Sequence, residues 1–249
     1  MGVINLIEIT NVSKTFGGKN KAVDNISLLI PDGEIVGFLG PNGAGKTTTI
    51  KMITGILRSD SGSIKINGID IEKEPIKAKK QFGFVPDSPD MFLRLKGIEY
   101  LNFMADVYEV DENDRKIRID GLAERFGMTE ALFDEIQGYS HGMRQKIVLM
   151  GALIHEPSVW ILDEPMTGLD PKSSFILKEM MKEHAAKNKT LFFSTHVLDV
   201  AEKICTKVAI INKGKILFYG SMEDMRHHFK GDESLEKMFL ELVENEKDA

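Results

Sequence analysis

Three features common in proteins are scarce or missing in this chain of 249 residues: cysteine, an excess of basic charge, and long apolar runs. Its one cysteine, Cys205, allows no disulfide within the chain and suits a reducing compartment. Lysine and arginine number 32 against 38 aspartate and glutamate residues, so the net charge is −6. Such a mildly acidic chain argues against a broad basic surface, and no nucleic-acid partner is expected.

A helix that crosses a bilayer needs about 18–20 apolar residues. The longest apolar stretch here, residues 147–154, is too short and is interrupted by Gly151. The N-terminus has no basic region before an apolar one, so no signal peptide is expected. These absences favour a cytoplasmic protein that reaches a membrane only through a partner.

What is present is the composition of an ordinary globular protein, 42% hydrophobic and 28% charged. Half-buried strands are expected at residues 6–10, 26–30 and 63–66. Continuous apolar runs, typical of a parallel sheet buried on both faces, occur at residues 35–39, 159–162, 191–193 and 208–211. Helical patterns fill the gaps, and residues 88–155 contain no convincing strand. The sequence therefore predicts an α/β core with an inserted helical subdomain.

A glycine-rich segment follows the first continuous apolar run. Residues 40–47 match the pattern G-x-x-x-x-G-K-[ST] of a phosphate-binding loop, between a predicted strand and a predicted helix. Glycines let the backbone N–H groups point into one cavity at a helix N-terminus, which favours a polyphosphate. Lys46 adds charge for the β- and γ-phosphates, and the Thr47 hydroxyl suits Mg²⁺. The residues expected to bind a nucleoside triphosphate here are Gly40, Pro41, Asn42, Gly43, Ala44, Gly45, Lys46, Thr47 and Thr48.

Two adjacent acids follow the apolar run of residues 159–162. Asp163 is expected to hold Mg²⁺ through water, and Glu164 to polarise the water that attacks the γ-phosphate. The alternative for both is a solvated strand end. The guanine-reading pattern N-K-x-D is absent, which argues against a GTPase.

The segment 139–145, Tyr-Ser-His-Gly-Met-Arg-Gln, precedes a helical run. It is similar to the signature of ATP-binding-cassette (ABC) ATPases, commonly written L-S-G-G-Q: Ser140 and Gly142 match, whereas Tyr139, His141 and Met143 depart. Ser140 suits a helix cap, and Gly142 leaves its backbone open to a phosphate oxygen. In the order of its motifs, nearly the whole chain resembles the ATP-binding subunit of an ABC transporter of the drug- and antibiotic-export type.

This resemblance implies both a fold and a division of the chain. The fold class is α/β: a P-loop NTPase with a RecA-like core sheet, an N-terminal antiparallel β-subdomain and an inserted helical subdomain. One ATP-binding domain is expected to span residues 1–249. Its parts are the core with the β-subdomain in 1–87 and 156–230, the helical subdomain in 88–155, and an acidic C-terminal helix in 231–249.

The resemblance also implies roles for three further residues. Phe16 resembles the aromatic residue that stacks on adenine, its alternative being a core phenylalanine. Asp170 ends a segment, residues 167–170, that resembles the aspartate loop at the dimer interface, a role compatible with a plain helix cap. His196 resembles the switch histidine that contacts the γ-phosphate, its alternative being a structural histidine. The expected catalytic residues are then Lys46, Glu164 and His196.

One position departs from the family pattern. Residues 83–86 resemble the approach to a loop whose glutamine meets Mg²⁺, the attacking water and the membrane subunit. Asp87 stands in the place of that glutamine. A carboxylate also accepts from water or approaches Mg²⁺, so Asp87 joins Thr47 and Asp163 as an expected metal contact. A solvated loop acid is the alternative.

In the family, two copies associate head to tail, so that Ser140 and Gly142 of one copy face the phosphate held by Lys46 of the other. The implied cofactors are ATP and Mg²⁺, and the implied partners are a second ATPase copy, as a homodimer, and a separate transmembrane permease subunit. Binding and hydrolysis would drive export from the inner face of the cell membrane. Met91, Phe92, Leu93 and Leu95 either contact that subunit or pack within the helical subdomain.

Two other classes of function stay open. A soluble ABC ATPase without a transporter would act on protein, ribosome or nucleic-acid assemblies. A non-hydrolysing module would use the nucleotide only as a gate, and the joint presence of Lys46, Asp163, Glu164 and His196 argues against it. Import, and pairing with a different cassette, are further alternatives.

Overall fold

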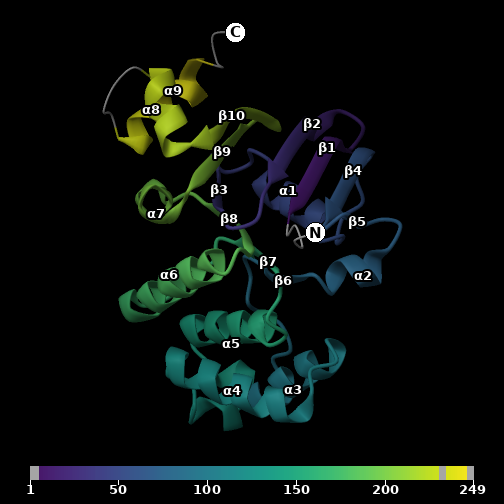
Figure 1. Cartoon of the computed structure of the whole chain (residues 1–249), viewed down its shortest axis with the longest axis vertical. Coiled ribbons are helices and arrows are strands. Elements are labelled where there is room, and N and C mark those ends of the chain that lie inside the picture. The colour runs from purple at the N-terminus through teal and green to yellow at the C-terminus, as the bar shows by residue number, and fades with distance from the viewer. Residues whose placement is uncertain (1–5, 230–233, 246–249) are drawn as a thin grey trace.

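The computed structural model describes residues 6–229 and 234–245, whose strands form two sheets (Figure 1). The first sheet is antiparallel, with the strand order β2-β1-β4-β5. Its strands are β1 Ile7–Phe16, β2 Asn20–Ile30, β4 Ser61–Ile66 and β5 Ile69–Asp70. The second sheet has the order β10-β9-β3-β8-β7-β6. Its strands are β3 Ile35–Leu39, β6 Phe82–Val85, β7 Val159–Asp163, β8 Thr190–Thr195, β9 Lys207–Asn212 and β10 Lys215–Ser221.

In the second sheet every neighbouring pair is parallel except β9 and β10. Strands β3, β7 and β8 are buried along their whole length, as their continuous apolar runs predict. The register pairs Leu39 with Thr195, and Ser194 with Asp163. The carboxyl ends of β3, β8 and β7 therefore meet at one edge of the sheet.

Two groups of helices lie at opposite ends of the molecule, and the others lie along the sheets (Figure 1). Helices α3, α4 and α5 lie together at one end of the molecule, and α8 and α9 lie beside β10 at the other. The helices are α1 Lys46–Ile53, α2 Pro75–Lys79, α3 Gly97–Val107, α4 Glu112–Phe126, α5 His141–Leu153, α6 Pro171–Ala186, α7 Leu198–Ile204, α8 Met222–Phe229 and α9 Leu235–Asn245. Two 3₁₀ turns, η1 Ala131–Phe133 and η2 Ile136–Gly138, precede α5.

The seven strands expected from the sequence are present, and the α/β fold class is confirmed. Strands β1 and β2 extend well beyond the expected segments, and β5, β6 and β10 were missed. Helix α9 falls within the expected C-terminal helix of 231–249, of which residues 231–233 and 246–249 lie outside the described residues. The division at residues 87, 155 and 230 stays a prediction.

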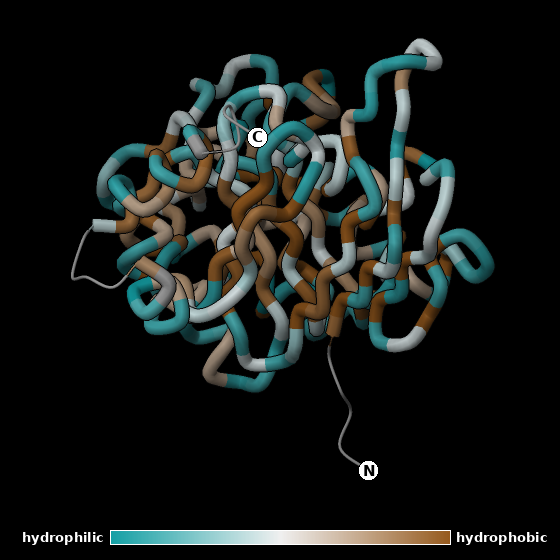
Figure 2. The backbone as a smooth tube through the Cα atoms, turned by 90° about the horizontal axis from the view of Figure 1, so that it is seen from above, coloured by the Kyte–Doolittle hydropathy of each residue, from teal (hydrophilic) through white to brown (hydrophobic). Residues whose placement is uncertain are grey.

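Hydrophobic residues run along the central strands, and hydrophilic ones along the outer loops (Figure 2). On one face of the large sheet Phe38 and Phe192, both fully buried, place their ring centroids 5.1 Å apart. On the other face β7 and β8 pack against the cluster that includes α3, α4 and α5. No helix in the described part of the chain is both long and apolar enough to cross a bilayer.

Phe192→Ala should lower the free energy of unfolding by about 3–5 kcal/mol, because it leaves a cavity against Phe38 in the fully buried core. Phe175, which is 60% exposed on α6, is the matched control, and Phe175→Ala should change the free energy by less than about 0.5 kcal/mol. Urea unfolding monitored by circular dichroism measures both, and equal effects would contradict the burial described here.

Candidate nucleotide-binding site

The phosphate loop connects β3 to α1 and curls tightly against its neighbours. Gly45 has φ 111° and precedes the first residue of α1. A Cβ atom there would stand 2.4 Å from the Ala22 carbonyl oxygen. A Cβ atom at Gly40 would stand 2.4 Å from the Ile211 carbonyl oxygen. Only glycine fits these two positions, so the backbone of the loop and the N-terminus of α1 face the same space.

The side chain of Lys46 lies inside this curl and is 7% exposed. Its ammonium donates to the carbonyl oxygens of Gly40, at 2.6 Å, and Pro41, at 3.3 Å. Burial lowers the pKa of Lys46, and three nearby carboxylates oppose that shift. They belong to Glu164, Asp163 and Asp87. The ammonium is therefore held among acids from two other loops.

Asp163, at the end of β7, is almost fully buried. The hydroxyls of Ser194, at 2.5 Å, and Thr47 both donate to its carboxylate. Burial raises the pKa of Asp163, these two hydrogen bonds oppose the shift, and the charges of Asp87 and Glu164 add to it. Asp163 thus connects the end of β7 to the first turn of α1.

Glu164 follows with a left-handed backbone, φ 48°. Its amide donates to Ser194 Oγ at 3.0 Å, and its carboxylate Oε2 lies 2.9 Å from His196 Nδ1. Because a carboxylate only accepts, Nδ1–H of His196 donates this bond. The Glu164 side chain is 15% exposed and the His196 side chain is 61% exposed. The exposed histidine therefore orients the carboxylate of the less exposed Glu164.

A cavity of about 350 Å³, the phosphate-loop cavity, brings most of the predicted residues together. Its lining residues are Ala22, Pro41, Asn42, Gly43, Gly45, Lys46, Thr47, Thr48, Asp87, Glu164, Thr167 and His196. Gly40 contributes its carbonyl to Lys46, whereas Ala44 is buried behind the loop. The sequence did not predict Ala22 and Thr167 as lining residues, nor Ser194 as the donor to Asp163. The one signal for Ser194 was its place near the end of the predicted strand that precedes His196.

Residues 139–143 do not line the phosphate-loop cavity. Ser140 caps α5, its hydroxyl accepting from the Met143 amide at 3.3 Å. Ser140 and His141 are exposed, while Tyr139 is buried and donates to the Ala131 carbonyl oxygen. The N-terminus of α5 is thus an open helix tip that its own chain does not place beside Lys46.

Asp170 likewise lies outside the cavity lining. It caps α6 through the Ser173 amide, at 2.9 Å, and pairs with Lys146 of α5 at 3.1 Å. Hydrogen bonds from Ser173, followed by Lys146, hold the pKa of Asp170 well below its usual range. A Cβ atom at Gly142 would stand 2.7 Å from the Gly168 carbonyl oxygen. The residue 167–170 loop is therefore joined to the helix that carries the signature.

Phe16 is 45% exposed at the end of β1, and Lys14 Nζ lies 5.9 Å from its ring centroid. It is not a core phenylalanine, and it does not line the phosphate-loop cavity. Its role as an adenine platform stays a prediction.

In the described ranges, no group of three or more His, Cys, Asp and Glu side chains is placed to hold a metal ion. Mg²⁺ usually binds proteins through one or two oxygen ligands and takes the rest from phosphates and water. The Thr47 hydroxyl and the Asp163 carboxylate, which contact each other, are hard oxygen donors that fit this requirement. Asp87 lines the same cavity and is a third oxygen donor there.

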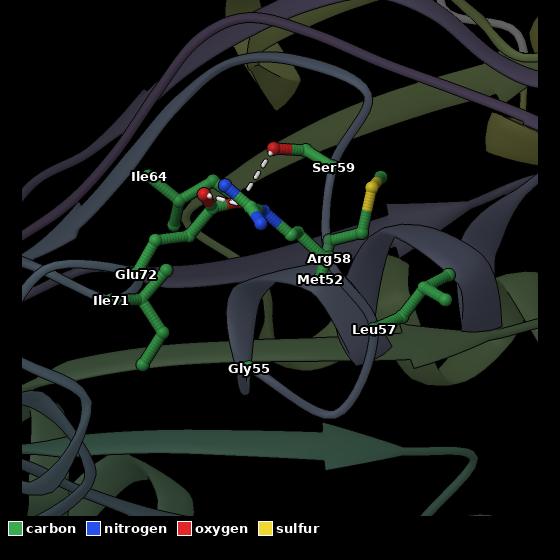
Figure 3. A pocket seen from close by; sticks show the side chains of 8 residues that line it. All are labelled: Met52, Gly55, Leu57, Arg58, Ser59, Ile64, Ile71 and Glu72. Carbon is green, nitrogen blue, oxygen red and sulfur yellow. Dashed lines mark hydrogen bonds and ion pairs between the residues drawn. The ribbon is translucent and has the colours of Figure 1, made fainter.

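A separate hollow of about 290 Å³ lies at the far end of α1 (Figure 3). Its walls include Met52 and Ile71, and Arg58 faces Glu72 across it. Arg58 Nε donates to Glu72 at 3.2 Å, and Ser59 donates to the other oxygen at 3.0 Å. Its arginine is already neutralised, and it shares no residue with the phosphate-loop cavity.

A parallel sheet with a phosphate loop after β3 and paired acids at the end of β7 defines a P-loop nucleoside triphosphatase. Residues 23–167 match the model of the ABC transporter family. The chain belongs to that family as an ATP-binding subunit, and it is an ATPase that binds nucleotide.

Relatives in Bacillus subtilis (strain 168) match along most of their length. The ABC transporter ATP-binding protein NatA is 35% identical over 94% of this chain and 97% of its own. The linearmycin resistance ATP-binding protein LnrL is 35% identical over 91% of this chain and 73% of its own. A solved ATP-binding subunit of an ABC transporter has a TM-score of 0.91 and 32% identity, over 95% of this chain and 99% of that chain.

Gly45→Ala should destabilise the protein by about 3 kcal/mol, because both the backbone conformation and the clash with Ala22 oppose a Cβ atom. Gly43→Ala is the matched control in the same loop, since its φ is 78° but nothing lies within 4 Å of the added atom. Its cost should be about 1 kcal/mol, from backbone strain alone. Thermal or urea unfolding compares the two, and an equal loss would contradict the close approach at Gly45.

Proposed function

We propose that this chain hydrolyses ATP for an exporter whose membrane-spanning part is a separate chain. The observation that carries the proposal is the phosphate-loop cavity, where Lys46, Glu164 and His196 come together above the buried Asp163. A phosphate-binding loop alone serves many enzymes, whereas a basic residue, a water-polarising acid and an orienting histidine in one cavity suit hydrolysis.

Binding is the first step. The backbone N–H groups of residues 43–47 and the N-terminus of α1 are placed to receive the β- and γ-phosphates. The Lys46 ammonium then exchanges its carbonyl partners for phosphate oxygens. When bound, Mg²⁺, held by Thr47 and through water by Asp163, supplies positive charge at the phosphate oxygens.

Hydrolysis is the second step. Glu164 accepts the proton of a water whose oxygen bonds to the γ-phosphorus while the bond to the β–γ bridging oxygen breaks, so that ADP and phosphate are the products. The hydrogen bond from His196 Nδ1 to Glu164 Oε2, at 2.9 Å, fixes the direction of that carboxylate. His196 lines the cavity, and its other ring nitrogen, Nε2, is the atom that would meet the γ-phosphate. Asp87, on the same cavity wall, accepts from the attacking water.

A second copy completes the site. The exposed N-terminus of α5, capped by Ser140, is absent from its own cavity and carries the partial positive charge of a helix end. Placed against the γ-phosphate of a second copy, with Gly142 leaving its backbone accessible, it closes a head-to-tail homodimer. Phe16 stacks on the adenine with its exposed face. One solved relative in fold, 22% identical with a TM-score of 0.79, is a dimeric ATP-binding cassette bound to ADP and Pi.

The membrane subunit docks on an aromatic patch that follows Asp87. Phe92 and Phe103 are each 43% exposed, with ring centroids 5.6 Å apart. Of the apolar residues near Phe92, Met91, Leu93 and Leu95 are partly buried and pack against the helical core. The aromatic patch therefore consists of Phe92 and Phe103 and leaves out Met91, Leu93 and Leu95, which the sequence suggested. Residues 88–91 connect it along the chain to Asp87 in the phosphate-loop cavity.

Export is the direction we infer. The support is the relative LnrL, whose name assigns it to linearmycin resistance, together with the resemblance of the Ser-x-Gly-Met pattern and of the acid at position 87 to export-type subunits. The chain would then act at the cytoplasmic face of the membrane, where ATP is available. The transported compound is chosen by the membrane subunit.

Glu164→Gln should abolish ATP turnover while ATP binding survives, because the amide cannot accept the proton but the loop and Lys46 remain. Dimers should accumulate with ATP on size-exclusion chromatography. Glu124→Gln, on the exposed side of α4, is the matched control and should hydrolyse normally. A Glu164→Gln variant that turns over ATP at the unaltered rate would refute the assignment.

Lys46→Ala should bind no ATP by calorimetry, whereas Lys51→Ala, on the same helix and exposed, should bind it.

Phe92→Ser combined with Phe103→Ser should leave ATP hydrolysis of the isolated chain unchanged but prevent its recovery with a polytopic protein from detergent-solubilised membranes. Phe133→Ser, on a 65% exposed ring of η1, is the control and should retain the partner. Recovery of ribosomal or other soluble assemblies instead would favour the soluble ATPase, and equal recovery by all variants would exclude this patch.

A further inference from the structure

A cavity of about 320 Å³ lies away from the phosphate loop, between α4, the segment before β7 and the end of α6. Helix α4 supplies Gly121 and Leu122, strand β7 supplies Trp160, and α6 and its C-cap supply Met180 and Lys187. The cavity shares no lining residue with the phosphate-loop cavity. We refer to it as the α4–α6 cavity.

Its inner surface is apolar and aromatic. Leu122 and Met180 face it beside Trp160, whose ring stacks on His184 with centroids 4.2 Å apart. Burial lowers the pKa of His184 to about 3, so this ring is neutral at physiological pH. At the mouth, Ile117 is 71% exposed. These surfaces suit a hydrophobic body of small size.

The rim is basic, although the chain carries a net charge of −6. It contains the cations Arg118, Arg125, Lys187 and Lys189 and the acids Glu156 and Glu183. Arg125 is neutralised by two hydrogen bonds to Glu183, at 2.8 and 2.9 Å. Lys187, which is exposed, makes no ion pair within the described residues. Arg118 pairs with Asp114, at 2.9 Å, and with Glu156, at 3.5 Å, and the Lys189 ammonium donates to the carbonyl oxygens of Glu156 and Pro157. The positive charge that the rim leaves unpaired is therefore that of Lys187, unlike the hollow in Figure 3, where Arg58 faces Glu72.

Gly121 keeps the cavity open. It lies in the interior of α4, where glycine is less favourable than alanine. Two common structural reasons for a glycine are missing, since its φ is not positive and no heavy atom lies within 4 Å of an added Cβ. A larger side chain at this position would reach into the cavity that Gly121 lines.

We propose that the α4–α6 cavity binds a small amphipathic anion. Its apolar body lies against Trp160, Leu122 and Met180, and its carboxylate or sulfonate is held by Lys187 with Lys189 beside it. Such a ligand spans α4, in the helical group, and α6, which packs on the large sheet, and so holds the two together. The proposal does not depend on nucleotide or on the membrane partner.

The probe is 1-anilinonaphthalene-8-sulfonate, an aromatic body with one sulfonate. Trp160 is the only tryptophan in the chain, so emission sensitised from tryptophan reports binding near this cavity. We expect saturable binding to the full-length chain, abolished by Gly121→Phe, which fills the cavity. Gly121→Ala is the matched control, since it also removes the unfavourable helix propensity of glycine but does not fill the cavity.

Charge is tested on one helix. Lys187→Glu should weaken probe binding roughly five- to tenfold, because it reverses the unpaired rim charge. Lys182→Glu makes the same change of net charge outside the lining and should bind as the unaltered chain does. Decanoate should displace the probe and decanol should not. Binding that is unchanged in Gly121→Phe, or displacement by decanol as effective as by decanoate, would overturn the proposal.

Discussion

The chemistry of this molecule depends on the parallel register of three adjacent strands. Because β8 pairs with β3 on one side and β7 on the other, Thr195 stands beside Leu39, and Ser194 beside Asp163. A segment of the candidate site follows each strand at this same edge. The phosphate loop follows β3, Glu164 follows Asp163 at the end of β7, and His196 follows β8. A one-residue shift of β7 would turn Asp163 to the opposite face and separate it from Ser194.

At that edge, electrostatics and burial pull in opposite directions. Burial favours the neutral forms of both Lys46 and Asp163, as the directions of their pKa shifts show. For Lys46 the carboxylates of Glu164, Asp163 and Asp87 offset this cost, whereas for Asp163 the charges of Asp87 and Glu164 add to it and the hydroxyls of Ser194 and Thr47 offset it. In the proposed function, an added polyanion would take up the lysine charge that the carbonyl oxygens of Gly40 and Pro41 now share.

The sequence predicted those parts of the candidate site that are formed by residues close together in the chain. The phosphate loop, the acid pair and the capped starts of α5 and α6 each need only local spacing, and all lie where expected. Ala22 reaches the cavity only because a segment distant in the sequence folds beside it, so no local pattern marks it. Thr167 begins the segment 167–170, whose pattern indicates a dimer interface and not the lining of this cavity. Strand β10 was missed although residues 216–219, Ile-Leu-Phe-Tyr, form an apolar run that marks it; in the structure these residues are only partly buried.

The separation of Ser140 from Lys46 within one chain gives the proposed dimer its means of signalling. Two contacts join the N-terminus of α5 to residues 167–170: the ion pair of Lys146 with Asp170, and the close approach of Gly142 to the Gly168 carbonyl. Thr167, at the start of that loop, lines the phosphate-loop cavity of the same chain. In the proposed dimer, a helix tip held at the phosphate of one copy would act through these two contacts on a loop that borders the phosphate-loop cavity of its own chain. Each site would then depend on the state of the other.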